Sequence, residues 1–184
     1  RELERRLLVT ALEQCRRSAI RHITARIGAG RLSVIQTLGE FGFELIDGIQ
    51  SFQLQLPSPL GTNKAVEGVR LALIEEDQVE KAASLAASVY RFDRFHSDST
   101  VRLDSTALQR CGLRLATIVL VATAESARGR GIGRAMTLYS LGWMMSQRVQ
   151  AVQVGTQLSN MAAARLYESC GFRVAGASLT FRKL

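Results

Sequence analysis

Cysteine, histidine and proline are all scarce in this sequence, which has three cysteines, two histidines and two prolines. Cys15, Cys111 and Cys170 lie far apart, and none of them belongs to a CxxC pair. A zinc cluster or a disulfide framework needs more ligands, or cysteines paired at short spacing. We therefore expect no metal site, reduced thiols and a cytoplasmic protein.

Long apolar runs are also absent, so we expect no membrane span. The first residue is Arg1 rather than Met, so we expect the native start to lie upstream, and nothing near it has the pattern of a secretory signal. Hydrophobic residues make up 47% of the chain and charged residues 22%. This composition is typical of a globular domain with a core.

The net charge of +8 is not concentrated in any long block of Lys and Arg. A basic surface favours anionic partners, such as nucleic acid, a membrane surface or phosphorylated small molecules. Nucleic-acid binding calls for a clustered basic patch or stacking aromatics, and aromatic residues make up only 6% of the chain. We therefore expect no nucleic-acid partner.

A pair of prolines divides the sequence. Before them, residue patterns predict a helix at residues 2–17, a strand at 20–27, a helix at 32–41 and a strand at 43–54 with Gly48 as a candidate bulge. Pro57 and Pro59 then mark a linker at residues 57–66. We predict a partial α/β lobe at residues 1–56 and a second domain at residues 67–184.

The second part of the chain alternates between strands and helices. The expected elements are strands at residues 68–74, 115–123, 149–155 and 172–182, and helices at 77–90, 131–148 and 160–170. Ile132, Met136, Tyr139 and Trp143 form one apolar stripe of the long helix, so Trp143 is expected in the core. Residues 91–114 are polar and give no clear pattern.

The clearest local motif is the run Arg128-Gly129-Arg130-Gly131-Ile132-Gly133-Arg134, between an apolar strand and an amphipathic helix. Glycines allow the backbone to turn sharply or approach a ligand, and the N–H groups of a helix start can hold a phosphate. The run lacks the last glycine of a GxGxxG fingerprint, and the chain has no GK[ST] tripeptide. It fits R-x-x-G-x-G, although a purely structural turn remains an alternative.

A second motif, N-x-x-A-x-x-L-Y-E-x-x-G-F, is present from Asn160 to Phe172 and includes Tyr167. With R-x-x-G-x-G before it at Arg128, Gly131 and Gly133, the chain resembles the GNAT family of acyl-CoA-dependent N-acyltransferases over about residues 115–172. This resemblance implies an α/β GNAT fold, a mixed and mostly antiparallel splayed sheet with flanking helices. It also implies acetyl-CoA as co-substrate.

The resemblance assigns roles to particular residues. Backbone amides of Val121, Ala122 and Thr123 are expected to bind the pantetheine arm, and amides of residues 129–134 the pyrophosphate. Asn160 and Tyr167 complete the cofactor-binding set that the resemblance implies. Tyr167 is also the expected catalytic acid for the leaving thiolate, and the alternative is a core aromatic residue.

Further segments are similar to the sugar-nucleotide branch of that family, the TDP-fucosamine acetyltransferase-like branch. They are Gly42 to Asp47, Arg94-Phe95-His96 with Asp98, Val154 to Asn160, and the final SLTFRKL. This branch has a partial GNAT lobe before the catalytic one. The resemblance implies Arg94, Phe95 and His96 as acceptor-site residues, a nucleotide-linked amino sugar as acceptor, and a homodimer as one admissible assembly.

The chain departs from the family in one region and leaves alternatives open. Between Asp98 and Leu115 there are too few residues for the two strands that a full GNAT domain has there. The acceptor can also be a protein amine or another small amine, and a non-catalytic acyl-CoA-binding module is the alternative of another class. Lone residues such as His96 and Glu125 also fit a solvated, non-catalytic role.

Overall fold

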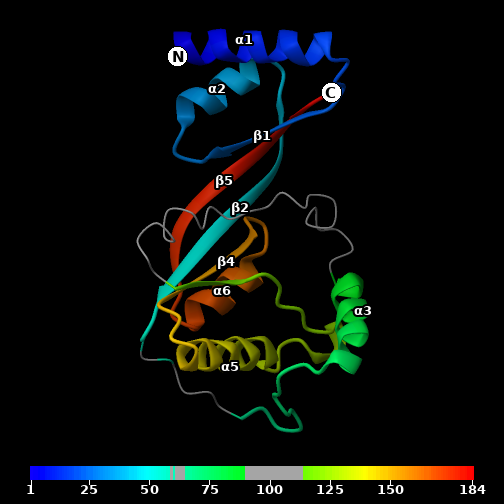
Figure 1. Cartoon of the computed structure of the whole chain (residues 1–184), viewed down its shortest axis with the longest axis vertical. Coiled ribbons are helices and arrows are strands. Elements are labelled where there is room, and N and C mark those ends of the chain that lie inside the picture. The colour runs from blue at the N-terminus through cyan, green and yellow to red at the C-terminus, as the bar shows by residue number, and fades with distance from the viewer. Residues whose placement is uncertain (59, 61–64, 90–113) are drawn as a thin grey trace. The chain divides into compact units, whose positions relative to one another are not determined.

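The computed structural model of the chain describes residues 1–58, 60, 65–89 and 114–184 (Figure 1). The helices are α1 (Glu2–Arg17), α2 (Leu32–Glu40), α3 (Val79–Val89), α5 (Ile132–Ser146) and α6 (Met161–Ser169). The strands are β1 (Ile23–Gly28), β2 (Glu44–Gln55), β3 (Leu115–Ile118), β4 (Ala151–Gln157) and β5 (Arg173–Lys183). Short 3-10 turns lie at Glu76–Gln78 and Glu125–Ala127. Every predicted helix is therefore confirmed, with small shifts of its ends.

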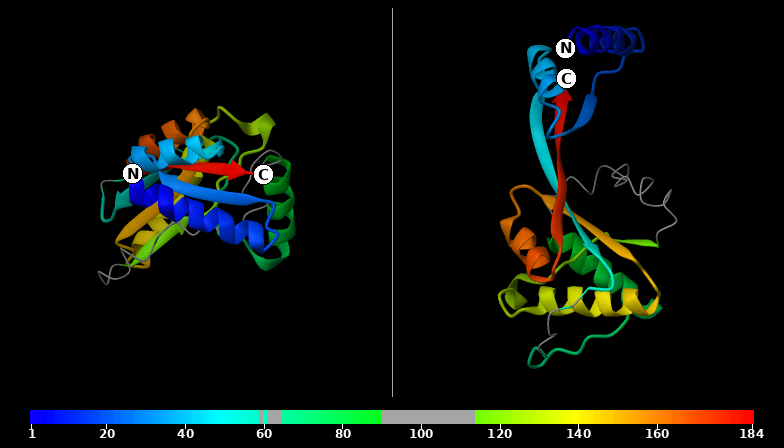
Figure 2. Two further views of the ribbon diagram at one scale, coloured as in Figure 1. Left: turned by 90° about the horizontal axis from the view of Figure 1, so that it is seen from above. Right: turned by 90° about the vertical axis from the view of Figure 1, so that its left-hand side faces the viewer.

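The described strands form one mixed sheet in the order β1-β5-β2-β4-β3. Strand β1 is antiparallel to β5, from Ile23 opposite Lys183 to Gly28 opposite Ser178. Strand β3 is parallel to β4, from Leu115 opposite Ala151 to Ile118 opposite Val154. Figure 2 shows β2 beside β5, although β2 comes from the first third of the chain. The N-terminal segment thus supplies an interior strand of the sheet.

The chain forms two compact units, and each of them draws on separate stretches of sequence. The first unit contains residues 1–51, 155–161 and 174–184, and the second contains residues 52–154 and 162–173. The predicted division at residues 57–66 stays a proposal about how the chain is organised. Strands β2, β4 and β5 contribute residues to both units.

The first unit has a small core beneath α1 and α2. Leu38, Phe43 and Phe181 are buried there, and Leu8 and Leu12 of α1 pack against them. Because α1 presents Leu8 and Leu12 at i, i+4 spacing, it covers this core with one face. Ion pairs join the beginning of α1 to the end of α2, from Arg1 and Arg5 to Glu40 at 2.8 and 2.6 Å.

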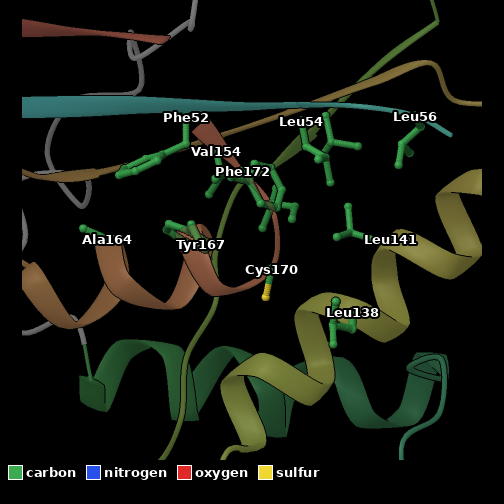
Figure 3. Close-up of a cluster of buried hydrophobic side chains, with 12 residues drawn as sticks. Phe52, Leu54, Leu56, Leu138, Leu141, Val154, Ala164, Tyr167, Cys170 and Phe172 are labelled. Carbon is green, nitrogen blue, oxygen red and sulfur yellow. The ribbon is translucent and has the colours of Figure 1, made fainter. Parts of the chain in front are cut away.

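The second unit has a larger core, and this core includes residues from before the two prolines. Phe52, Leu54 and Leu56 of the β2 segment are buried with Leu138 and Leu141 of α5 (Figure 3). The other buried members are Ile118, Val152, Val154, Ala164, Tyr167, Cys170 and Phe172. Burial at this scale is the main stabilising contribution to a domain of this size.

The prediction that the stripe of α5 with Tyr139 and Trp143 lies in the core is wrong. Trp143 is 47% exposed and Tyr139 is 38% exposed, whereas Leu138 and Leu141 are buried. Residues 135–147 contain no charged side chain, so beyond its first turn the helix is apolar or uncharged on every side. Sequence spacing therefore could not identify which face is buried, because the usual contrast between an apolar face and a charged face is missing.

Two predicted strands also differ from the structure. In the predicted strand at residues 68–74, no residue has strand conformation, and Leu73 and Ile74 are 58% and 55% exposed. The predicted strand at 115–123 ends at Ile118, where the pairing with β4 ends. Strand conformation depends on a paired neighbour, and alternating apolar residues alone do not supply one.

Candidate functional site

The glycine run Gly129–Gly133 forms the turn that begins α5. Gly129 and Gly131 have φ values of 76° and 79°, which is the left-handed region that favours glycine. A Cβ atom added at either position would meet nothing within 4 Å. The two glycines are therefore required by backbone conformation, and the space beside them is open to a ligand.

Helix α5 starts directly after this turn. Gly131 is its N-cap, and the Ala135 N–H donates to the Gly131 carbonyl at 3.0 Å, which closes the first helical turn. The first N–H groups of a helix have no carbonyl partner within that helix, and the helix dipole gives this end a partial positive charge. The geometry is that of an anion site made of backbone amides.

Three of the predicted segments come together in the second unit. A Cβ atom on Gly133 would lie 3.3 Å from Leu166 Cδ2 and 3.7 Å from Thr123 Oγ1. The start of α5 therefore packs closely against α6 and against the segment that follows β3. This contact was not predicted from the sequence, although a glycine within the first turn of a helix was a signal for it.

Arginine side chains brace the same turn. Arg128 Nε donates to the Thr123 carbonyl at 3.4 Å, and Arg130 Nη2 donates to the Glu67 carbonyl at 3.3 Å. With Arg134 in the first turn of α5, three guanidinium groups lie along residues 128–134. Guanidinium groups keep their charge at all physiological pH values and suit phosphate oxygens.

Residues 119–124 continue beyond the parallel pairing without strand conformation. Val119 is 88% exposed and Leu120 is 49% exposed, whereas Val121 packs against the core of the second unit. The pairing of β3 with β4 ends at Ile118 and Val154. Val121, Ala122 and Thr123 thus lie past the end of the ladder, and their role toward pantetheine stays a prediction.

Tyr167 lies in the core of the second unit. Its exposed fraction is 5%, and its ring centroid lies 5.8 Å from that of Phe52 and 6.0 Å from that of Phe172 (Figure 3). The ring therefore stabilises the core whatever its hydroxyl does. A role as a catalytic acid stays a prediction, in which the buried ring fixes the direction of the hydroxyl.

Helix α6 ends as its sequence predicts. Gly171 has a φ of 93°, and its N–H donates to the Glu168 carbonyl at 3.0 Å. The Phe172 N–H donates to the Tyr167 carbonyl at 3.1 Å, which completes the C-terminal cap. The apolar side chain of Phe172 is fully buried, so the cap also fixes the position of the helix against the core.

The remaining predicted residues are distributed as follows. Asn160 belongs to the first unit, where its N–H donates to the Gln157 carbonyl at 2.9 Å. Arg94, Phe95 and His96 lie outside the described residues. Glu125 is exposed, which supports the interpretation as a solvated carboxylate.

Cys170 directly follows the last residue of α6, three residues after Tyr167, and is also buried. Burial raises the pKa of the Cys170 thiol, with a smaller opposing effect from Ser169. A thiol with a raised pKa is a poor nucleophile at neutral pH. Within the described residues, no group of three His, Cys, Asp or Glu side chains could hold a metal ion, and no helix is long and apolar enough to cross a membrane.

Replacing Cys170 by Ala is expected to leave the activity of the protein unchanged, because a buried thiol with a raised pKa is not expected to act as a nucleophile. The free energy of unfolding should fall by about 1 kcal/mol, because a buried sulfur is lost. Steady-state turnover and urea denaturation measure the two effects. A loss of turnover in a variant that remains folded would contradict the expectation.

Comparison with known proteins identifies the class of protein. Residues 80–172, which are half of the chain, match the model of the acetyltransferase (GNAT) family. The chain therefore belongs to the GNAT acetyltransferase family. Residues 128–134 and Tyr167 all lie within the matched span.

Two curated relatives share part of this span. A mycothiol acetyltransferase of Acidothermus cellulolyticus is 35% identical over 69 residues, which is 38% of this chain and 21% of that protein. A streptothricin acetyltransferase of Escherichia coli is 29% identical over 65 residues, which is 35% of this chain and 37% of that protein. The matched segment thus spans well under half the length of either relative.

Solved structures show the same fold. A GCN5-related N-acetyltransferase from Sphaerobacter thermophilus has a TM-score of 0.63 and 19% identity, covering 88% of this chain and 59% of its own. A tandem GNAT protein from the clavulanic acid biosynthesis pathway has a TM-score of 0.62 and 13% identity, covering 97% of this chain and 68% of that chain. The predicted GNAT fold is confirmed, whereas the sugar-nucleotide branch stays a prediction.

Proposed function

We propose that the chain is an N-acetyltransferase that moves an acetyl group from acetyl-CoA to a primary amine. The observation that carries this proposal is the start of α5. There, two glycines in left-handed conformation leave open space before the amides of a helix end. Membership of the GNAT acetyltransferase family, matched over residues 80–172, supports the same assignment.

In this proposal, acetyl-CoA is bound at two places along its length, the pyrophosphate and the pantetheine arm. The amides of Gly129 to Arg134 hold the pyrophosphate, with the nearby guanidinium groups adding positive charge. Amides of residues 121–123 hold the pantetheine arm. The contact of Gly133 with Thr123 and Leu166 supports this arrangement. It keeps the backbone amides of residues 129–134 at a fixed distance from those of residues 121–123.

The reaction proceeds by direct attack of the amine on the thioester. The neutral amine nitrogen forms a bond to the acetyl carbon, and a backbone amide stabilises the developing oxyanion. The carbon–sulfur bond then breaks, and the thiolate takes up the proton of the Tyr167 hydroxyl. The amine releases its proton to solvent water, and the Tyr167 phenolate regains a proton from solvent, which restores the enzyme for the next turnover. Proton transfer from a phenol with a pKa near 10 to a thiolate is chemically reasonable.

The proposed acceptor is a nucleotide-linked amino sugar bound together with acetyl-CoA in a ternary complex. The net charge of +8 would favour a diphosphate-bearing substrate. The relatives named above, a mycothiol and a streptothricin acetyltransferase, point to small-molecule acceptors rather than protein amines. The charge argument then favours an anionic member of that group.

One structural observation favours a second candidate function. Tyr167 is 5% exposed and packs against two phenylalanines, as an aromatic residue with a purely structural role would. A non-catalytic acyl-CoA-binding module would need the amide site but no proton donor. The two candidates differ in turnover and share the affinity for acetyl-CoA.

Titration calorimetry with acetyl-CoA tests the shared step. We expect micromolar affinity in the unaltered chain, and at least about tenfold weaker binding in Gly131→Glu, because its side chain adds bulk and negative charge beside the pyrophosphate. Gly131→Ala introduces the same backbone strain without the charge and is expected to bind more tightly than Gly131→Glu.

A matched charge control is Gly176→Glu, since an added Cβ at Gly176 also meets nothing within 4 Å and that residue lies in β5 of the first unit. It is expected to bind acetyl-CoA as the unaltered chain does. Absence of binding by a folded, unaltered chain would overturn the proposed function, and the glycine run would then be a structural turn only.

A further inference from the structure

Helix α5 has one face in the core of the second unit (Figure 3) and a different apolar face at the surface. On the outer face, Tyr139 is 38% exposed and Trp143 is 47% exposed. Gly142 and Ser146 are exposed beside them, so the four residues follow the i, i+3, i+4, i+7 spacing of one stripe. Two large aromatic side chains next to each other differ from the isolated apolar residues of an ordinary surface, and they indicate an interaction surface.

The glycine of this surface stripe is not required by anything inside the chain. Gly142 lies within α5 and has no left-handed φ, and an added Cβ atom there would meet nothing within 4 Å. Glycine is unfavourable in the interior of a helix, and here neither the backbone conformation nor the available space calls for it. A glycine at an open position does allow the backbone of another molecule to approach closely.

The surface around the stripe is free of charge, which limits the kind of partner. The chain has a net charge of +8, yet residues 135–147 contain no charged side chain. Two copies of a chain with this net charge repel each other, and the repulsion is least where both surfaces are uncharged. The same residues offer no attraction to an anionic partner. The charge pattern therefore favours a second copy of this chain over a nucleic acid or an acidic protein.

Large and small residues alternate along the stripe in a way that is complementary to its own copy. Two α5 helices can pack antiparallel about a two-fold axis that passes between Gly142 and Trp143. Tyr139 of one copy then faces Ser146 of the other, and Trp143 faces Gly142. Each large ring meets a small residue, and each contact occurs twice, as an interface between identical surfaces requires.

We propose that the surface stripe of α5 is the interface of a homodimer, formed by antiparallel packing against α5 of a second copy. The glycine turns that begin the two helices lie at opposite ends of such a pair, which leaves both turns open. The inference goes beyond the proposed function and does not rest on it, because neither the contact nor its test involves acetyl-CoA.

The size of the contact sets the strength of the dimer. A helix of 15 residues is about 22 Å long, so one helix pair buries less than the ~800 Å² per partner of a standard interface. We therefore expect a reversible dimer with a dissociation constant on the order of 10–100 µM. Properties of the single chain, such as the stability of Trp143→Ala, are accordingly measured at about 1 µM, where the monomer dominates.

Trp143 is the only tryptophan of the chain, so its fluorescence reports directly on this surface. Between about 1 and about 500 µM protein, the emission should shift to shorter wavelength as the ring becomes buried. Sedimentation equilibrium should show the mass rising from 20.2 kDa towards twice that value. A mass that stays at 20.2 kDa over this range overturns the proposal. So does a shift that a monomeric chain shows only on addition of phosphatidylcholine vesicles, since the stripe would then bind a lipid surface.

A charge placed at the centre of the contact tests the location of the interface. Gly142→Glu fills the space near the axis and brings two like charges together, so the dissociation constant should rise at least about tenfold. Folding should be preserved, because glutamate favours a helix more than glycine does and the position is open. The matched control is Gly39→Glu, at an exposed position of α2 where an added Cβ also meets nothing within 4 Å. It should dimerise as the unaltered chain does. Equal dimerisation by Gly142→Glu overturns the proposal, because the contact then lies elsewhere.

An exchange of large and small residues tests the antiparallel register. In Tyr139→Ser two serines face each other, and in Ser146→Tyr two tyrosines do, so each variant alone should dimerise at least about fivefold more weakly. A mixture of the two variants restores a tyrosine opposite a serine at both places. Native mass spectrometry of the mixture should therefore show heterodimers in clear excess over either homodimer. Heterodimers that are no more abundant than random mixing gives would overturn the proposed pairing.

Discussion

Replacing Tyr167 by Phe is expected to lower acetyl transfer by about 100-fold, the usual range for removing a general acid. The ring lies between Phe52 and Phe172, and a phenylalanine ring can keep both contacts. Acetyl-CoA affinity should therefore stay close to that of the unaltered chain. A fall in kcat without a rise in Kd is the signature of a group that acts in the transition state.

Tyr139 offers a control for the same chemical change. It is 38% exposed on α5, so Tyr139→Phe removes a hydroxyl from a tyrosine outside the core. Its turnover and affinity should match those of the unaltered chain. If Tyr167→Phe also keeps full turnover, Tyr167 is a core aromatic residue and another group protonates the thiolate. If the unaltered chain binds acetyl-CoA but transfers no acetyl group to any amine, the non-catalytic module is favoured.

Replacing Phe52 by Ala is expected to have the largest effect on stability, a loss of about 4 kcal/mol in the free energy of unfolding. Phe52 is fully buried and contacts the Tyr167 ring at the centre of the second unit. A typical domain has only about 5–15 kcal/mol of stability, so this one change would remove a large part of it. Urea denaturation, followed by circular dichroism, measures the difference.

The matched aromatic control for that experiment is Trp143→Ala. Trp143 is 47% exposed, so the loss of stability should be within about 1 kcal/mol. Similar losses for the two variants would contradict the assignment of Phe52 to the core and of Trp143 to the surface. The comparison also tests whether a strand from before Pro57 is part of the core that supports the proposed acetyl-CoA site.

The order of elements was largely predictable because period and turn residues are encoded locally. Helix α6 shows this well, since its apolar spacing and Gly171 together fix its face and its end. The turn before α5 was also visible in the sequence, because alternating glycines, which readily adopt a left-handed backbone conformation, directly precede the apolar residues of a predicted helix. The two motifs then led to the family and therefore to the fold.

Pairing between distant strands could not be predicted in the same way. Nothing in the sequence near residue 118 shows that the partner strand stops pairing there, so the strand was expected to continue to residue 123. Nor does the local pattern at residues 68–74 reveal whether any neighbour is present. Both errors concern a hydrogen-bonded partner that lies far away along the chain.

The direction of side chains also could not be predicted from the sequence, and this limited the predictions of both the core and the candidate site. The uncharged surface of α5 gave no basis for choosing between Leu138 and Trp143 as the buried residue. The close approach of Leu158 to Gly48, whose carbonyl accepts a hydrogen bond from the Leu158 N–H at 2.8 Å, was equally hidden, because a glycine within a strand fits a bulge as well as a close approach. The residues of the two motifs were visible in the sequence, whereas the side chains that pack against them, such as Leu166 beside Gly133, required the structure.

The pairing of β1 with β5 also has a consequence for how the chain folds. Residues 23–28 lie opposite residues 178–183, so two strands from opposite ends of the sequence depend on each other. Contacts of such long sequence separation slow folding, because the loop between them must close before the contacts form. During synthesis, the backbone of β1 must wait unpaired for its partner, and an unpaired strand edge can associate with other chains. We therefore expect refolding in the test tube to be slow and to lose yield as protein concentration rises.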